Sequence, residues 1–229
     1  MSGTGPRLRV LRIWARREGM CLAILERALS LLRAEKGLPE SEVDLNRRLY
    51  FCLLTASSEL YPADPVAPIS ECNNQPDPDD TSRAAREQKR PDFQWVYRDR
   101  YEPDPKRSSK QFVVECKRLG KPSRPDWVFN LNYVRHGVCR FRDPKWAYAQ
   151  RFASGAMVGY CQNMPPPQVL KEVNEEARKN SCRILLVPER TPPAAIAWNT
   201  PLTDRSMSRH SIYSTYGLTC DDRAPNSVD

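Results

Sequence analysis

The chain has 229 residues, of which 40% are hydrophobic and 28% are charged, and its 36 Lys and Arg exceed its 28 Asp and Glu. This length fits one compact core with extensions better than two domains, and the net charge of +8 favours a polyanionic partner. The best candidate for a membrane span, residues 21–32, is interrupted by Glu26 and Arg27, so the sequence predicts no membrane association.

Residues 1–19 are rich in arginine and lack the apolar run and cleavage site of a secretory signal, which predicts a basic N-terminal tail. Leucines recur at spacings of three and four in residues 20–36 and a glycine follows, so this segment is predicted to be a helix. Ser41 supplies an N-cap, in a variant of the capping box, for a second helix that should run to about Leu60.

The middle of the chain alternates between proline-rich and apolar segments. Five prolines among Asp, Asn and Ser predict a surface loop over residues 61–80. Residues 92–97 and 111–117 are rich in Val, Phe, Trp and Tyr, which is typical of strands. We expect these two strands to form a hairpin whose long basic tip is the charged segment 98–110.

In the C-terminal third, Asp143 followed by proline predicts the start of a helix that runs to about Asn163. A further polar helix is expected over residues 168–179, followed by an apolar strand over 182–187. The last residues, 221–229, are polar and are expected to form a loose tail. A single domain would then span residues 20–220.

The eight cysteines are scattered without CxxC pairs, and the chain has only two histidines, His136 and His210. This pattern disfavours a structural zinc site or a disulfide framework, and it predicts free thiols in a reducing, cytoplasmic environment. Neither histidine lies in a recognisable motif, so a thiol nucleophile with a histidine base is also disfavoured.

Charged side chains stand at the end of the second predicted strand. Because side chains alternate between faces, Glu115 and Lys117 share one face of residues 111–117, while the apolar side chains at alternate positions form core. Antiparallel pairing around the tip brings Asp92 beside Cys116, so Asp92, Glu115 and Lys117 converge. Two neighbouring carboxylates repel each other when ionised, and a bound Mg²⁺ or Mn²⁺ makes such an arrangement favourable.

A proline before Asp92, followed by Glu115-Cys116-Lys117 at the end of an apolar strand, resembles the PD-(D/E)xK nuclease superfamily. The resemblance covers residues 41–187. It implies an α/β fold with a restriction-endonuclease-like core (αβββαβ), in which helices flank a mixed central sheet. The expected element order fits this core except for one central strand, which the sequence does not place.

The resemblance also implies roles for these residues. Asp92 and Glu115 would hold Mg²⁺ or Mn²⁺, and the main-chain carbonyl of Cys116 would be a further metal ligand. Lys117 would position or activate the attacking water. The alternative interpretation of the same residues is a surface salt bridge between Glu115 and Lys117 on an ordinary hairpin.

Many members of the superfamily use a further glutamate from the helix that precedes the strands. Glu42 is our first choice for this position, with Glu40 and Glu59 as alternatives. Gln150 is a candidate for a polar residue that some members place near the site. Residues 133–160 are similar to small nucleases of bacterial restriction and antiviral defence loci.

Positive charge is concentrated around the expected site. Residues 83–151 hold 18 Lys and Arg against 8 Asp and Glu, a net of +10, whereas the rest of the chain is net −2. Such a surface binds nucleic acid through its phosphates. The candidate nucleic-acid contacts are Arg98, Arg100, Lys106, Arg107, Lys110, Arg118, Lys121, Arg140 and Arg142. The aromatic residues that would either stack on bases or pack in the core are Trp95, Tyr97, Tyr101 and Trp127.

These patterns predict a metal-dependent nuclease that hydrolyses phosphodiester bonds in nucleic acid, with DNA as the first choice. No separate target-recognition domain is evident, so a homodimer or a partner subunit would supply specificity. The alternative is a nucleic-acid-binding effector subunit whose nuclease-like site is silent. A basic scaffold protein without nucleic acid is a third possibility, and it would show neither metal-stimulated activity nor strongly salt-dependent binding.

Overall fold

The computed structural model describes residues 6–122, 124–146, 148, 154–182, 196–202 and 210–217. For residues 6–12, 196–202 and 210–217 only the backbone is described.

A mixed sheet of six strands forms the centre of the described structure, in the order β1-β2-β3-β4-β6-β5. The strands are β1 (Ile69–Ser70), β2 (Phe93–Arg98), β3 (Ser109–Gly120), β4 (Ser154–Gln162), β5 (Ile196–Leu202) and β6 (His210–Gly217). β3 pairs parallel with β4, and β4 with β6, whereas the other neighbouring pairs are antiparallel. The predicted α/β class and the mixed sheet are therefore confirmed.

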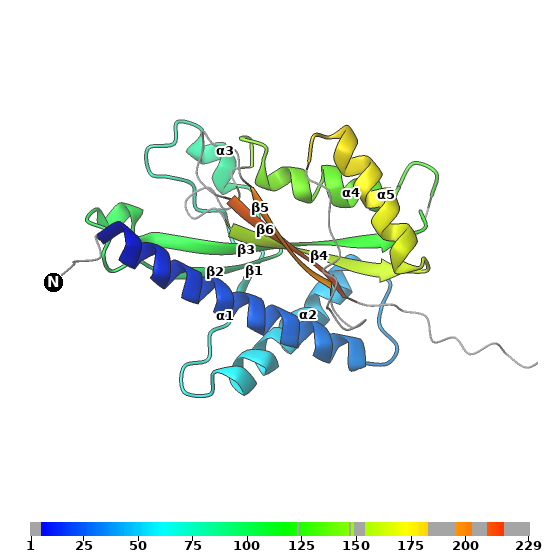
Figure 1. Cartoon of the computed structure of the whole chain (residues 1–229), viewed down its shortest axis with the longest axis horizontal. Coiled ribbons are helices and arrows are strands. Elements are labelled where there is room, and N and C mark those ends of the chain that lie inside the picture. The colour runs from blue at the N-terminus through cyan, green and yellow to red at the C-terminus, as the bar shows by residue number, and fades with distance from the viewer. Residues whose placement is uncertain are drawn as a thin grey trace, which may run out of the picture.

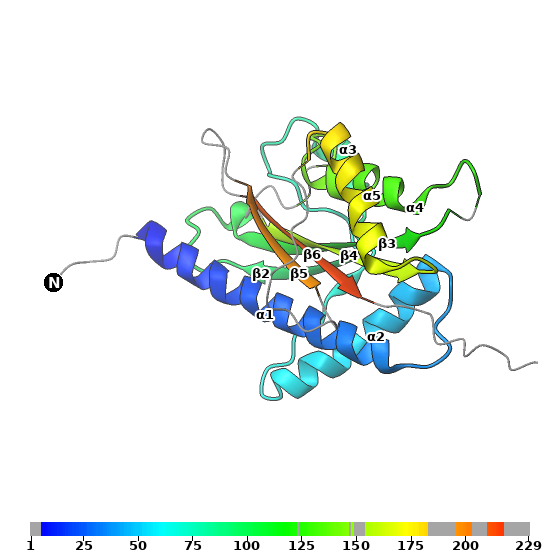
Figure 2. The same ribbon diagram turned by 45° about the vertical axis from the view of Figure 1, so that its right-hand side comes forward.

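Helices cover both faces of the sheet (Figures 1 and 2). α1 (Pro6–Ala34) and α2 (Glu42–Leu60) lie against one face, and α4 (Phe129–Arg135) and α5 (Pro166–Lys179) against the other. The remaining short elements are α3 (Arg83–Glu87) and the 3₁₀ turns η1 (Pro105–Arg107) and η2 (Val138–Phe141). None of the helices described is both long enough and apolar enough to cross a membrane.

β3 contributes to two separate hydrophobic cores because its side chains alternate between the faces of the sheet. Phe112, Val114 and Cys116 pack in the core under α1 and α2. Val113 and Leu119 pack in the core under α4 and α5. The predicted alternation along this strand is confirmed, and the strand is buried on both sides.

The first helix is longer than the sequence indicates. It begins at Pro6, so residues 6–19 of the expected basic tail are helical, and that part of the prediction is wrong. Trp14 anchors this segment, because its indole N–H donates a 3.0 Å hydrogen bond to the Ser154 hydroxyl at the start of β4. The arginine-rich composition predicted a tail, whereas Trp14 holds this part of α1 against the sheet.

Other predicted elements are confirmed. α2 has Ser41 at its N-cap, although Ser41 makes no side-chain cap hydrogen bond. α5 ends at the predicted Lys179. The expected strand over 182–187 lies outside the described residues except for Cys182, and the expected tail over 221–229 lies wholly outside them.

The helix predicted for residues 143–163 is wrong, because residues 154–162 form the strand β4. Both faces of β4 are buried, so its sequence does not alternate between apolar and polar residues, and periodicity alone cannot separate such a strand from a buried helix. β4 contains Gly155 and Gly159, and neighbouring groups approach both glycines closely. A Cβ at Gly155 would lie 2.8 Å from the Val113 carbonyl oxygen and would overlap the Phe141 ring.

We therefore expect Gly155→Ala to destabilise the protein by roughly 1–3 kcal/mol, because extra volume in a packed core forces its neighbours to shift. Gly19→Ala is the control, since Gly19 lies within α1 and a Cβ there meets nothing within 4 Å. This control should stabilise the protein by about 0.4–1 kcal/mol. Urea denaturation of both variants measures the difference, and equal stabilities would contradict the close packing around β4.

Candidate active site

The β2–β3 hairpin brings Asp92 to the position that the sequence predicts. Phe93 pairs with Val114, and the Asp92 side chain reaches across to accept the Cys116 N–H at Oδ2, with 2.6 Å between the heavy atoms. Its other oxygen accepts a hydrogen bond of 3.0 Å from Asn46 Nδ2 on α2. Two donors from two elements therefore fix the orientation of this carboxylate.

The ammonium of Lys117 lies among four oxygen atoms. Its Nζ is 2.8 Å from Glu42 Oε1 and 3.1 Å from Glu115 Oε1. It donates to the Cys116 carbonyl at 2.6 Å and lies 4.0 Å from Asp92 Oδ2. The Lys117 side chain is only 13% exposed, so this cation is largely shielded from solvent. Three carboxylates and one carbonyl thus surround the Lys117 ammonium.

Glu42 is the glutamate of α2 that reaches this point, because it stands in the first turn of the helix, directly beside β3. Its Oε2 accepts the Arg118 N–H at 3.1 Å, while its Oε1 pairs with Lys117. Glu59 instead pairs with Arg27 on α1 at 2.7 Å. The main-chain carbonyl of Glu40 accepts a hydrogen bond from the Gln162 side chain. Gln150 lies outside the described residues.

Glu115 is the most deeply buried member of the site, with 1% of its side chain exposed. Its Oε1 also accepts a hydrogen bond from Arg140 Nη1, and the Arg140 guanidinium lies 4.0 Å from the centroid of the Trp146 ring. Its Oε2 is buried without a hydrogen-bond partner among the described residues. An unpartnered buried carboxylate oxygen is costly, and a cation would satisfy it.

Burial and neighbouring charges together set the pKa values of this cluster. Loss of solvation, together with the Asp92 charge, raises the pKa of Glu115 to about 8. Loss of solvation also raises the pKa of Asp92, and the Lys117 charge partly opposes that shift. Burial alone would lower the pKa of Lys117, but the charges of Glu115, Asp92 and Glu42 outweigh it and raise that pKa. Lys117 is therefore a permanent cation at neutral pH.

A raised carboxyl pKa makes stability depend on pH. Glu115 contributes stability fully below its ordinary pKa near 4.5, and this contribution is lost as the pH rises toward 8. We expect the melting temperature in EDTA to fall between pH 5 and pH 8 by more in the parent protein than in Glu115→Gln, which cannot ionise. Thermal denaturation across this range measures the slopes, and identical slopes would contradict the raised pKa.

Two residues of the site were missed from the sequence. Asn46 donates to Asp92, and its own Oδ1 accepts a 2.7 Å hydrogen bond from the Tyr160 hydroxyl on β4. Asn46 follows Glu42 by four residues, so the two share a helix face, and this spacing was an available signal. Tyr160 falls within the wrongly predicted helix 143–163, and its hydroxyl in fact supports the site from β4.

The predicted nucleic-acid contacts fall into separate groups. Arg140 lies inside the site, against Glu115. Arg118 borders it, with its guanidinium 4.2 Å from the Phe129 ring centroid and its Nε 2.8 Å from Gln162 Oε1. Lys121 is exposed just beyond β3. Arg142 is exposed and donates to the Ser181 carbonyl at 2.5 Å, at the end of α5.

The remaining basic candidates lie at the other end of β3, on the hairpin tip. Lys110 is buried and pairs with Glu102 at 3.2 Å, and Arg107 pairs with Asp79. The tip cations that are exposed are Arg98, Arg100 and Lys106. Of the four aromatic candidates, Trp95 is core and Tyr97 is half-buried, whereas Tyr101 and Trp127 are exposed.

The donor set fits a hard divalent cation in its chemistry, because all four groups around Lys117 Nζ offer oxygen, which Mg²⁺ and Mn²⁺ prefer. The unpartnered Oε2 of Glu115 adds a further free acceptor. Within the described part of the chain, no three Asp, Glu, His or Cys side chains are already arranged closely enough to hold a metal ion. The carboxylates enclose the Lys117 ammonium instead, so a metal ion would have to displace it.

No protein-family model matches the chain, and no curated protein or solved structure matches it significantly. The functional argument therefore depends on the geometry of the site itself.

Proposed function

We propose that the protein is a metal-dependent nuclease of the PD-(D/E)xK type that hydrolyses phosphodiester bonds, with DNA as the preferred substrate. One observation carries this proposal: oxygens of Glu42, Asp92 and Glu115 and the Cys116 carbonyl surround the ammonium of Lys117. A surface salt bridge between Glu115 and Lys117 alone would not recruit carboxylates from α2 and from the residue before β2.

The order of elements supports the same proposal. Helix α2 is followed by β1, β2 and β3, then by α4 and β4, which, apart from the short α3 between β1 and β2, corresponds to the αβββαβ order of the restriction-endonuclease-like core. β4 pairs parallel with β3 and lies between β3 and β6 in the sheet, so the strand that carries Glu115 and Lys117 has a neighbour on each side. The candidate ligands also come from the end of this hairpin and from the preceding helix, as the resemblance implies.

In this proposal Asp92, Glu115 and the Cys116 carbonyl hold Mg²⁺ or Mn²⁺, and Glu42 is a further ligand. The metal ion would polarise the phosphate and lower the pKa of an attacking water. Lys117, once displaced from the carboxylates, orients that water and offsets negative charge that develops on the phosphate. Arg140 keeps Glu115 in place from the opposite side, so it is a positioning residue.

The site is open on one side, which gives a polymeric substrate a route to it. Glu42 and Asp92 are 31% and 18% exposed, whereas Glu115 is closed off at 1%. Arg118 flanks the open side and its main chain contacts Glu42. A phosphate would therefore approach past α2, with exposed cations such as Lys121 close to its path.

The test is incubation of the protein with plasmid DNA and with structured RNA, each in Mg²⁺, Mn²⁺ or EDTA. We expect cleavage of DNA in either metal and none in EDTA. Salt-sensitive binding without cleavage under any condition would favour the effector subunit with a silent site. Neither binding nor cleavage would leave the basic scaffold protein as the better interpretation.

A further inference from the structure

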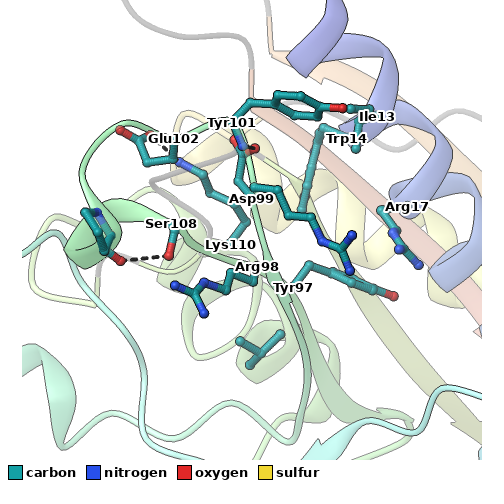
Figure 3. A pocket seen from close by; sticks show the side chains of 13 residues that line it. Ile13, Trp14, Arg17, Tyr97, Arg98, Asp99, Tyr101, Glu102, Ser108 and Lys110 are labelled. Carbon is teal, nitrogen blue, oxygen red and sulfur yellow. Dashed lines mark hydrogen bonds and ion pairs between the residues drawn. The ribbon is translucent and has the colours of Figure 1, made fainter.

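A cavity of about 820 Å³ lies away from the candidate active site, between α1 and the tip of the β2–β3 hairpin (Figure 3). Its volume is within the range of small-molecule sites. The seven-residue step from Lys110, which lines the cavity, to Lys117 corresponds to roughly 23 Å along β3. The cavity is thus a separate feature, and the proposed nuclease chemistry does not use it.

Aromatic and cationic side chains line this cavity together. α1 contributes Trp14 and Arg17, and the hairpin contributes Tyr97, Arg98, Arg100 and Tyr101. The Arg17 guanidinium lies 5.0 Å from the centroid of the Tyr97 ring. Tyr101 is 56% exposed, and in Figure 3 its ring extends toward Ile13 across the cavity. An exposed aromatic ring of this kind is a stacking platform for a nucleobase.

The charges in the cavity favour an anion. Its lining holds four cations against the two carboxylates of Asp99 and Glu102. Glu102 is already paired with Lys110 at 3.2 Å, and Asp99 accepts the Tyr101 N–H at 3.0 Å. Arg98 and Arg100 are exposed and form no ion pair with any described residue. Guanidinium groups bind phosphate through paired hydrogen bonds, so these two arginines are suited to a phosphate group.

We propose that this cavity is a nucleotide-binding pocket that stacks a base on Tyr101 and binds a 5′-phosphate through Arg98 and Arg100. The ligand is either a free mononucleotide or the terminal nucleotide of a nucleic-acid strand, because both present the same chemistry. The pocket would give the protein a second point of contact with nucleotides, independent of metal.

Isothermal titration calorimetry in EDTA tests this proposal with the full chain and without cleavage. The ligands are AMP, adenosine, inorganic phosphate and a short DNA strand with or without a 5′-phosphate. We expect AMP to bind more tightly than adenosine, and Arg98→Ala/Arg100→Ala to weaken AMP at least tenfold, since each charge-assisted hydrogen bond lost is worth about a factor of ten or more. Tyr101→Ala should weaken AMP but not inorganic phosphate.

The matched control is Lys171→Ala/Arg178→Ala, which removes two exposed positive charges from α5 on the other face of the sheet. It should bind AMP like the parent protein. If only the 5′-phosphorylated strand binds, and Arg98→Ala/Arg100→Ala abolishes that binding, the ligand is the end of a strand. That result would also support the pocket. Absence of binding by AMP and by both strands, or an equal loss in the control, would overturn it, whatever the outcome of the cleavage assay.

A second, independent observation concerns two cysteines. Cys139 in η2 and Cys182 after α5 lie 43 residues apart in sequence, yet their Sγ atoms are 3.6 Å apart. Arg142 Nη1 lies 3.3 Å from Cys182 Sγ. The Cys139 hydrogen bond and this guanidinium lower the pKa of the Cys182 thiol below its ordinary value. A disulfide needs the sulfurs to approach to about 2.05 Å, which is a small shift from this contact.

We infer that Cys139 and Cys182 form a reversible disulfide when the protein meets a peroxide. The Cys182 thiolate attacks one oxygen of hydrogen peroxide and becomes a sulfenic acid, with the second oxygen leaving as water after protonation. Cys139 sulfur then displaces the sulfenic oxygen as a second water, so that two thiols and one peroxide give one disulfide and two waters. The bond would tie η2, which carries Arg140, to the end of α5.

Mass spectrometry of the peroxide-treated protein should show a loss of about 2 Da and a single linked peptide that contains both cysteines. Cys139→Ser and Cys182→Ser should each abolish this link, whereas Cys72→Ser, at another partly exposed cysteine, should retain it. Closing a loop of this length should raise the melting temperature by roughly 8–16 °C. A peroxide-treated parent protein that carries only unlinked oxidised cysteines, or a link to a different cysteine, would overturn the inference.

Discussion

Glu115→Gln is expected to reduce metal-dependent cleavage by at least about 1,000-fold, because it replaces a charged ligand whose metal ion contributes several kcal/mol to transition-state stabilisation. Glutamine keeps the shape of glutamate and can still accept the hydrogen bonds that Lys117 and Arg140 donate. Burial and the Asp92 charge raise the pKa of Glu115 to about 8, so without metal the folded protein disfavours the negative charge that glutamine removes. The melting temperature in EDTA should therefore be unchanged or raised.

The control for this variant is Glu59→Gln, since Glu59 is another glutamate of the chain that the sequence alone offered for the site and the structure places it against Arg27 instead. It should cleave at the parent rate. Cleavage is measured by plasmid nicking in Mg²⁺, and Mg²⁺ binding by the rise in melting temperature that the ion causes. Parent-like cleavage by Glu115→Gln would show that the catalytic centre lies elsewhere.

Asp92→Ala should abolish cleavage as well. Relief of the repulsion between the Asp92 and Glu115 carboxylates would by itself stabilise this variant, but a larger cost opposes it. The Asp92 carboxylate accepts hydrogen bonds from the Cys116 N–H and from Asn46. Alanine would leave both donors without their acceptor in a buried environment, which costs about 1–3 kcal/mol for each group. Glu115→Gln therefore separates an effect on catalysis from an effect on stability better than Asp92→Ala does.

The hairpin and the carboxylate cluster could be predicted from the sequence because they depend on local rules. Alternation along β3 decides which side chains share a face, and antiparallel pairing decides that Asp92 lies beside Cys116. These rules require only that two apolar segments pair about a charged tip. The same reasoning left Glu42 as one of three candidates, because the distance between a helix terminus and a strand is a tertiary property.

The errors arose where tertiary contacts override local pattern. β4 lies between β3 and β6 with both faces covered, so its composition shows neither alternation nor charged positions that would identify its faces. Counting charges also could not separate free cations from paired ones. Lys110 is buried against Glu102, and Arg140 is bound to Glu115, although both contribute to the same basic segment of the sequence.

Lys117→Ala is expected to have the opposite effect on stability from Glu115→Gln. The ammonium is the cation that Glu42, Asp92 and Glu115 share, so its removal leaves shielded negative charges without a partner. Breaking a buried ion pair from one side costs about 3–5 kcal/mol, which corresponds to a fall in melting temperature of roughly 6–20 °C for a chain of this size. Thermal denaturation in EDTA measures this fall.

Addition of Mg²⁺ should restore more stability to Lys117→Ala than to the parent protein, because in the variant the ion replaces a missing cation and does not have to displace one. Turnover should nevertheless remain reduced by at least about 100-fold, since the group proposed to orient the attacking water is absent. Affinity for DNA should change little, because one charge among many contributes little to binding. Lys117→Arg should restore stability but little turnover, since a guanidinium is broader than an ammonium and remains protonated.

Lys121→Ala is the matched control, since Lys121 follows the same strand but is exposed. It should melt like the parent protein in EDTA and in Mg²⁺. If Lys117→Ala lost affinity for DNA and turnover to the same extent, the lysine would be a phosphate anchor and not a positioner of water. If instead Mg²⁺ stabilised Lys117→Ala no more than Lys121→Ala, the oxygens around Lys117 Nζ would not be a metal site, and the carboxylates would serve only to bury a lysine.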